Sequence, residues 1–136
     1  MKPVKILLVG LAAIALFTGC ATTGVHPWTE NLMGTKYRKA TVDNKQTYFR
    51  QIWAVEDNGE LRISGYLRLK GMHGFRVPDY VEVALITPGG DPMAAQKVLY
   101  YPRSLYGRKS HREGRFVATF ALIPPEGTTV RLENVN

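Results

Sequence analysis

The sequence predicts an all-β fold, in which about seven antiparallel strands form a single sandwich or barrel. Apolar residues alternate with polar residues in short runs, as in strands with one buried and one solvated face. Gly, Pro, Asn and Asp separate these runs, as turns between strands require. After residue 20 no stretch has apolar residues at helical spacing, and no period of about 20–50 residues repeats, which argues against helical bundles, solenoids and propellers.

The expected strands are, in chain order, 36–42, 47–56, 61–70, 80–87, 93–101, 115–123 and 128–135. The alternation is clearest in 61–70, where one face carries Leu61, Ile63, Gly65, Leu67 and Leu69. In three other strands the inward residues are expected to be Phe49, Trp53 and Val55, then Val81, Val83 and Leu85, then Phe116, Phe120 and Leu122. The turns are expected at 57–59, 88–91 and 124–127, and two longer connections remain at 71–79 and 102–114.

A short hydrophobic segment begins the chain. Lys2 and Lys5 lead into an uninterrupted run of twelve apolar or small residues, 6–17, and further small residues follow. These are the three parts of a secretory signal peptide. The run is too short for a membrane span, which needs about 20 residues. We therefore expect a signal peptide at 1–19.

Cys20, the only cysteine, directly follows this segment. The stretch 17–20, "FTGC", resembles the lipobox of bacterial lipoproteins, with Phe17 where Leu is usual. The resemblance implies that Cys20 carries acyl chains such as palmitate and becomes the first mature residue. Because Ala21 rather than Asp follows, it also implies an outer-membrane anchor facing the periplasm. The inner membrane, the cell surface, an ordinary cleaved signal and an uncleaved anchor stay open as alternatives.

Cleavage before Cys20 leaves 117 residues, enough for one domain, with 16 basic and 11 acidic side chains and a net charge of +5. A lipidated Cys20 leaves no thiol for a disulfide, so an aromatic-rich core must hold the fold. Residues 20–35 are small and polar, which indicates the lipidated Cys and a flexible tether before a β-sandwich domain at 36–136. Trp28 and Leu32 are residues through which this tether can dock.

A family resemblance rests on three stretches, "LRISGYLRL", "VEVALITPGGDPMAAQKVLYYP" and "GRFVATFALIPPEGTTVRLE". They are similar to the small immunoglobulin-like or transthyretin-like sandwiches of bacterial envelope lipoproteins, including FxLYD-type domains. The similarity covers about half of the chain, residues 60–125. It implies a single immunoglobulin-like β-sandwich after a lipoprotein signal peptide, and a non-catalytic role.

The densest positive charge lies in 103–115, "RSLYGRKSHREGR", which carries a net charge of +4. Guanidinium groups bind phosphate and carboxylate in a bidentate manner. The candidate anion- or partner-binding residues of this loop are Arg103, Tyr106, Arg108, Lys109, His111, Arg112 and Arg115. The alternative is a solvated loop whose charges protect an edge strand. A second basic and aromatic set, formed by Arg62, Tyr66, Arg68 and Lys70, is interpreted as the solvent side of a strand.

Catalytic and metal sites lack a recognisable pattern. His26, His73 and His111 have no metal-binding spacing, and none of the three serines lies in Gly-x-Ser-x-Gly. The acidic residues mostly mark turns. We therefore expect no enzyme, no cofactor and no metal, and the export signal argues against nucleic acid as a partner.

The sequence thus predicts a membrane-anchored lipoprotein that faces the periplasm and acts as a non-catalytic binding or envelope-assembly module. Its expected partners are the membrane, through acyl chains on Cys20, and an envelope protein, lipopolysaccharide or an anionic cell-wall polymer. Pairing of an edge strand and contact through 103–115 are the two expected modes. The alternatives are a small-ligand carrier with a pocket between the sheets and a cell-wall hydrolase.

Overall fold

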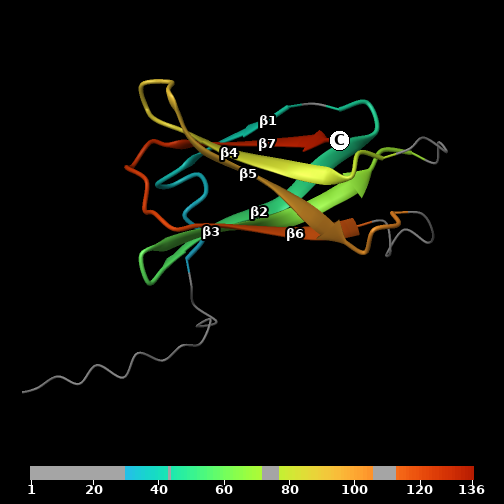
Figure 1. Ribbon diagram of the computed structural model, residues 1–136, viewed down its shortest axis with the longest axis horizontal. Coiled ribbons are helices and arrows are strands. Elements are labelled where there is room, and N and C mark those ends of the chain that lie inside the picture. The colour runs from blue at the N-terminus through green and yellow to red at the C-terminus, as the bar shows by residue number, and fades with distance from the viewer. Residues whose placement is uncertain (1–29, 43, 72–76, 106–112) are drawn as a thin grey trace, which may run out of the picture.

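The computed structural model describes residues 30–42, 44–71, 77–105 and 113–136, and these residues form an all-β fold without a helix (Figure 1). Its seven strands are β1 (Arg38–Thr41), β2 (Thr47–Asp57), β3 (Glu60–Leu69), β4 (Tyr80–Ile86), β5 (Pro92–Tyr101), β6 (Glu113–Phe120) and β7 (Thr129–Val135). All seven expected strands are confirmed, with shifts of a few residues at their ends.

The strands form one mixed sheet in the order β1-β7-β4-β5-β6-β3-β2, bent until it nearly closes a barrel (Figure 1). β5 joins the two halves, because it pairs with β4 along its length and with β6 at Tyr100 and Tyr101. A sandwich of two separate sheets is therefore not confirmed. The expectation that every strand is antiparallel is wrong for β1, which runs parallel to β7. A parallel pair joins segments far apart in the chain, so no local turn signal announces it.

A β-bulge corrects the expected orientation of β2. Between the pairs Arg50–Tyr66 and Trp53–Ser64, β2 has one residue more than β3, and Gln51 has a left-handed φ of 49°. One extra residue moves every later side chain to the opposite face of the strand. Ile52 and Ala54 therefore face the core. The expected inward position is wrong for Trp53 and Val55, which lie on the outer side opposite Ser64 and Arg62, and Trp53 is 45% exposed.

The other core strands match the expected alternation. The inward residues of β3 and β4 are buried, as are Phe116 and Phe120 on β6. β6 ends at Phe120, earlier than expected, but Leu122 still packs partly buried against the core. The largest side chains with almost no exposure include Tyr37, Tyr100 and Phe116. Large residues thus fill the space between the two halves of the sheet.

The turns lie where the sequence predicts them. Asn58 and Gly59 both have positive φ, 49° and 75°, as a two-residue turn between β2 and β3 requires. At 87–91 the Thr87 amide donates to the Asp91 carbonyl at 2.8 Å, and the Asp91 amide donates to Thr87 Oγ1 at 3.0 Å. These contacts fix the hairpins that set the register of the sheet.

The segment before β1 covers part of the β2 edge. The Asn31 side chain pairs with the β2 backbone: its Nδ2 donates to the Ile52 carbonyl at 3.0 Å and its Oδ1 accepts from the Ala54 amide at 2.9 Å. The Leu32 amide donates to the Ala54 carbonyl, and Leu32 and Met33 pack against the core. The end of the expected tether is therefore held against the sheet from Asn31 onward. At the far end of β2, the buried Thr47 hydroxyl donates to Asn134 Oδ1 of β7 at 3.0 Å.

Candidate functional site

Aromatic and basic side chains gather on the outer side of one half of the sheet. They project from β2, β3 and β6 and from the end of β5, on the face opposite the buried alternation of these strands. We call this set the basic–aromatic face. Its members are Tyr48, Arg50, Trp53, Arg62, Tyr66, Arg68, Tyr101, Glu113 and Arg115.

The centre of the basic–aromatic face is a row that crosses four strands. Arg50 of β2 lies opposite Tyr66 of β3, Tyr66 lies opposite Arg115 of β6, and Arg115 lies opposite Tyr101 of β5. Side chains that face each other on adjacent strands have Cβ atoms about 4.5–5.5 Å apart. The row therefore alternates guanidinium and phenol groups at the spacing of the strands.

A second, mostly apolar row runs beside the first. Trp53 of β2 lies opposite Ser64 of β3, which lies opposite Val117 of β6. Trp53 is 45% exposed and Val117 40%, and in the first row Tyr101 reaches 62%. Ser64 is short, so it rises little above the sheet between its two larger neighbours. Trp, Tyr and Arg, which are all present on this face, are the residue types most enriched at the energetically dominant positions of binding surfaces.

The charge of the face is unbalanced. Glu113 is the one carboxylate among these nine residues, and it pairs with Arg68 at 3.2 Å and with Arg50 at 3.7 Å. Asp57 and Glu60 lie on the same side of β2 and β3, at the hairpin end beyond Arg62. Within the described part of the chain, Arg62 and Arg115 have no acidic partner. Both side chains are exposed. Their guanidinium groups are thus available to an anionic ligand.

Of the loop residues expected to bind anions, the structure describes Arg103 and Arg115. Arg115 lies at the centre of the basic–aromatic face. Arg103 is bound within the fold, because it donates to the Asp79 carbonyl and carboxylate at 2.8 and 3.2 Å and lies 5.2 Å from the centre of the Tyr100 ring. Outside the described residues lie Cys20, Tyr106, Arg108, Lys109, His111 and Arg112.

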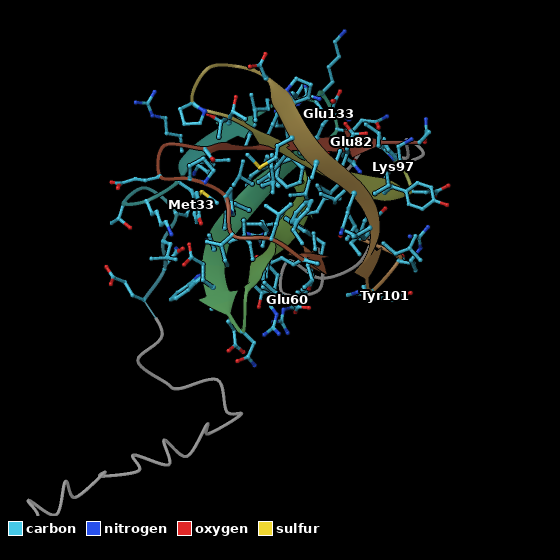
Figure 2. The ribbon with its side chains drawn as sticks, turned by 60° about the vertical axis from the view of Figure 1, so that its left-hand side comes forward. Met33, Glu60, Glu82, Lys97, Tyr101 and Glu133 are labelled. Atoms are coloured by element: carbon cyan, nitrogen blue, oxygen red, sulfur yellow. The ribbon has the colours of Figure 1, made fainter. Side chains whose placement is uncertain are left out.

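The outer side of the other half of the sheet has a different character. Glu82 of β4 lies opposite Glu133 of β7 and Lys97 of β5, and Arg131 pairs with Glu82 at 3.5 Å. Figure 2 shows Glu82, Glu133 and Lys97 together, with Tyr101 apart from them at the end of β5. A hollow of about 470 Å³ lies on this side, lined by the Glu82–Arg131 pair, Ala84, Ile86 and neighbouring β5 residues. It lies outside the sheet and not between its halves, and its opposite charges compensate each other.

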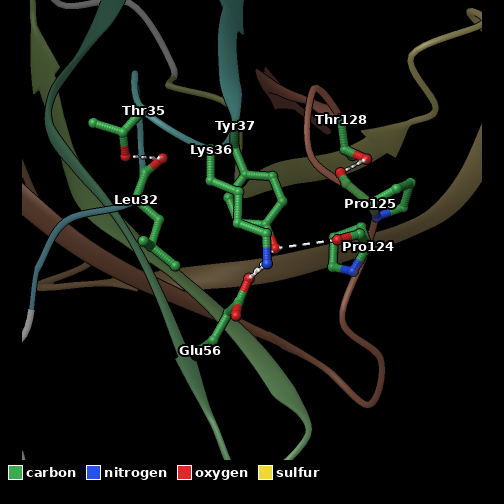
Figure 3. A network of polar contacts seen from close by, with 8 residues as sticks. All are labelled: Leu32, Thr35, Lys36, Tyr37, Glu56, Pro124, Pro125 and Thr128. Atoms are coloured by element: carbon green, nitrogen blue, oxygen red, sulfur yellow. Dashed lines mark hydrogen bonds and ion pairs between the residues drawn. The ribbon is translucent and has the colours of Figure 1, made fainter.

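A partly buried polar network joins β2 to the segment before β1 (Figure 3). Glu56 accepts hydrogen bonds from the hydroxyl of Tyr37, which is 1% exposed, and from Lys36 Nζ. Burial, followed by the hydrogen bond and charge of Glu56, raises the pKa of Tyr37 far above its ordinary value of 10.0. Burial also tends to raise the pKa of Glu56, but the hydrogen bonds from Lys36 and Tyr37 and the charge of Lys36 outweigh it and lower that pKa. Since each group is occupied within the fold, the network is structural.

Among residues 30–42, 44–71, 77–105 and 113–136, no group of three or more His, Cys, Asp or Glu side chains is placed to hold a metal ion. No helix in those ranges is long and apolar enough to cross a bilayer. Comparison of the chain with models of known protein families, with curated proteins and with solved structures finds no match.

Sequence reasoning found β3's share of the basic–aromatic face but not its extent. Arg62, Tyr66 and Arg68 were recognised as one side of a strand, and Arg115 as part of a loop. Their neighbours Arg50 and Tyr101 come from strands whose pairing is set over long distances in the chain. Pairing counted outward from the hairpin at 57–60 would place Arg50 opposite Leu67, and only the extra residue at the β2 bulge brings it opposite Tyr66, so no local signal gives this neighbour.

Proposed function

We propose that this protein is a lipid-anchored module of the bacterial cell envelope that binds an anionic partner through the basic–aromatic face and catalyses no reaction. The row Arg50–Tyr66–Arg115–Tyr101 is the observation that carries the proposal. It presents two guanidinium groups and two aromatic rings on one continuous surface of paired strands, which holds them in a fixed arrangement.

The anchor is the second part of the proposal. It rests on the lipobox-like stretch 17–20 and on the tether that follows. The likeness to small immunoglobulin-like envelope domains belongs here too, and it is supported by an all-β fold whose two halves face each other across one core. An anchored module meets its ligand at the membrane surface, where lipopolysaccharide and anionic wall polymers are concentrated.

The carrier alternative has less support. A carrier needs space between the two halves of the sheet, and Tyr37, Tyr100 and Phe116 occupy that region together with the aliphatic core. Edge pairing is also less favoured at β2, because Asn31 and Leu32 already use the backbone groups of Ile52 and Ala54. We therefore favour the outer face of the sheet over its interior and over this part of its edge.

Binding is tested by retention of the full-length protein, purified in detergent, on an immobilised sulfated dextran. The variant Arg62→Gln/Arg115→Gln is expected to elute at lower salt than the wild type, because counterion release falls with each lost cation. The matched control Lys39→Gln/Lys97→Gln removes the same charge from exposed positions on β1 and β5 and is expected to elute close to the wild type. Equal elution of the two double variants contradicts a localised site.

The anchor is tested by growing cells with labelled palmitate. The wild type is expected to incorporate the label and to fractionate with the outer membrane, and Cys20→Ala to do neither. An unlabelled wild type, together with a Cys20→Ala protein that remains membrane-bound at full length, contradicts lipidation.

A further inference from the structure

We infer that the anionic partner is a linear acidic glycan, with a carboxylate on every second sugar, that lies across the strands of the basic–aromatic face. This inference rests on the proposed function and specifies the ligand of the same surface. It follows from the spacing of the central row, from the order of its side chains and from the apolar row beside it.

The spacing comes from the sheet itself. Neighbouring strands lie about 4.7–4.9 Å apart, so the Cα atoms of Arg50 on β2 and Arg115 on β6, with β3 between them, are separated by roughly 10 Å. A pyranose ring in an extended glycan advances by about the spacing of two neighbouring strands. A chain that crosses the strands therefore presents one sugar to each strand, and alternate sugars meet Arg50 and Arg115.

The order of side chains matches a glycan with alternating charge. Tyr66 stands between the two arginines, and Tyr101 follows Arg115. The uncharged sugars then meet phenol rings, whose faces pack against the C–H groups of a pyranose and whose hydroxyls bond to those of the sugar. The charged sugars meet guanidinium groups, which bind carboxylates through two parallel hydrogen bonds.

The neighbours of the row give the ligand site two unlike sides. On one side Trp53 and Val117 offer exposed apolar surface with short Ser64 between them. On the other, Glu113 contacts the Arg50 guanidinium at 3.7 Å and so restrains its position. A compact polyanion such as polyphosphate uses only the arginines and leaves the tyrosines and Trp53 without a partner.

The experiment measures binding of defined probes to the full-length protein in detergent by titration calorimetry. The probes are hyaluronan oligosaccharides, in which acidic and neutral sugars alternate, oligogalacturonate, in which every sugar is acidic, neutral cello-oligosaccharides, polyphosphate and oligo-thymidylate. At equal concentrations of negative charge, we expect hyaluronan oligosaccharides to bind most tightly. Tyr66→Ala and Tyr101→Ala are each expected to weaken that binding about tenfold, which corresponds to about 1.4 kcal/mol, and to leave polyphosphate binding unchanged, because only the glycan loses the packing of a sugar against the ring.

The control variant is Tyr80→Ala, which truncates an exposed tyrosine on β4, away from the face. Its affinity for the glycan is expected to equal that of the wild type. Because Tyr101 is 62% exposed, Tyr101→Ala is expected to keep the fold, and circular dichroism checks this. The test therefore holds even where Tyr66→Ala alters the fold.

The outcomes separate the two proposals. In one outcome, polyphosphate binds as tightly as the hyaluronan oligosaccharides, and the tyrosine variants bind both ligands as tightly as the wild type does. The face is then a general anion site, so the glycan inference is wrong and the proposed function stands. Tighter binding of oligo-thymidylate or oligogalacturonate also overturns the inference. If no anionic probe binds, the proposed function fails together with it.

Discussion

Replacing Glu56 by Gln removes the charge at the centre of the network that joins β2 to the segment before β1. Glu56 accepts from Lys36 and from the buried Tyr37 hydroxyl, whose second acceptor, the Pro124 carbonyl, is 3.4 Å away. Hydrogen bonds to a charged group contribute about 1.5–3 kcal/mol and neutral ones about 0.5–1.5 kcal/mol. The variant is therefore expected to lose about 1–2 kcal/mol of unfolding free energy at pH 7, which corresponds to roughly 5–15 °C in Tm for a domain of this size.

The pH dependence gives the same prediction a second test. The folded protein holds the pKa of Glu56 below its ordinary value of 4.5. A lowered folded pKa contributes stability that is complete above the unfolded pKa and is lost as pH falls through the folded pKa. Urea unfolding should therefore show a difference between wild type and Glu56→Gln at pH 7 that shrinks below about pH 4.5. The control Glu60→Gln, at an exposed turn position, should match the wild type. Equal stability of Glu56→Gln and wild type at pH 7, or a difference that persists unchanged at pH 3, refutes the reasoning.

Two further predictions concern the β2 bulge and the residue beneath it. A Cβ on Gly65 would lie 2.4 Å from Ile52 Cδ1, so Gly65→Ala is expected to lower the free energy of unfolding by about 1–3 kcal/mol. The control is Gly89→Ala, whose Cβ would meet nothing closer than 3.8 Å and which is expected to change stability little. Urea unfolding of the two variants and the wild type measures the difference. Gln51 adopts a left-handed φ of 49°, so Gln51→Gly is expected to preserve or raise Tm and Gln51→Val to lower it by several degrees, and an unchanged Tm in Gln51→Val contradicts the strain assigned to this position.

The strand alternation and the turns were predictable because they depend on residues that are neighbours in the sequence. The alternation in 61–69 sets the inward face of β3, and Asn58-Gly59 sets the turn before it. The bulge was not predictable, because in "FRQIW" at 49–53 two polar residues are followed by two apolar ones, and either Ile52 or Trp53 can be the inward residue of a strand. Ile52 takes the inward position because its side chain packs over Gly65 of the neighbouring strand β3. Packing between strands therefore decides whether Trp53 faces the core or the solvent.

The candidate site was predictable only in parts, for a related reason. Arg115 was recognised from its place in a run of positive charge, but its role depends on Tyr66 and Tyr101 on either side. These cross-strand neighbours are set by pairings between strands distant in the chain. Arg103, which has the same charge and lies near the start of the same run, is instead committed to Asp79. Both residues were located by charge in the sequence, and they are distinguished by the sheet register of Arg115 and by the bonds of Arg103 to Asp79.

The hydrogen bonds between the Asn31 side chain and the backbone of β2 have a mechanical consequence for the proposed anchor at Cys20. A pull on the anchor enters the domain at Asn31 and passes through its side-chain bonds to the backbone of Ile52 and Ala54. Trp53, between these two residues, and Arg50 just before them belong to the basic–aromatic face. In the proposed anchored form, tension between a bound polymer and the membrane therefore leaves the sheet through its edge strand β2, after passing between the strands β5, β6 and β3 that carry the rest of the basic–aromatic face.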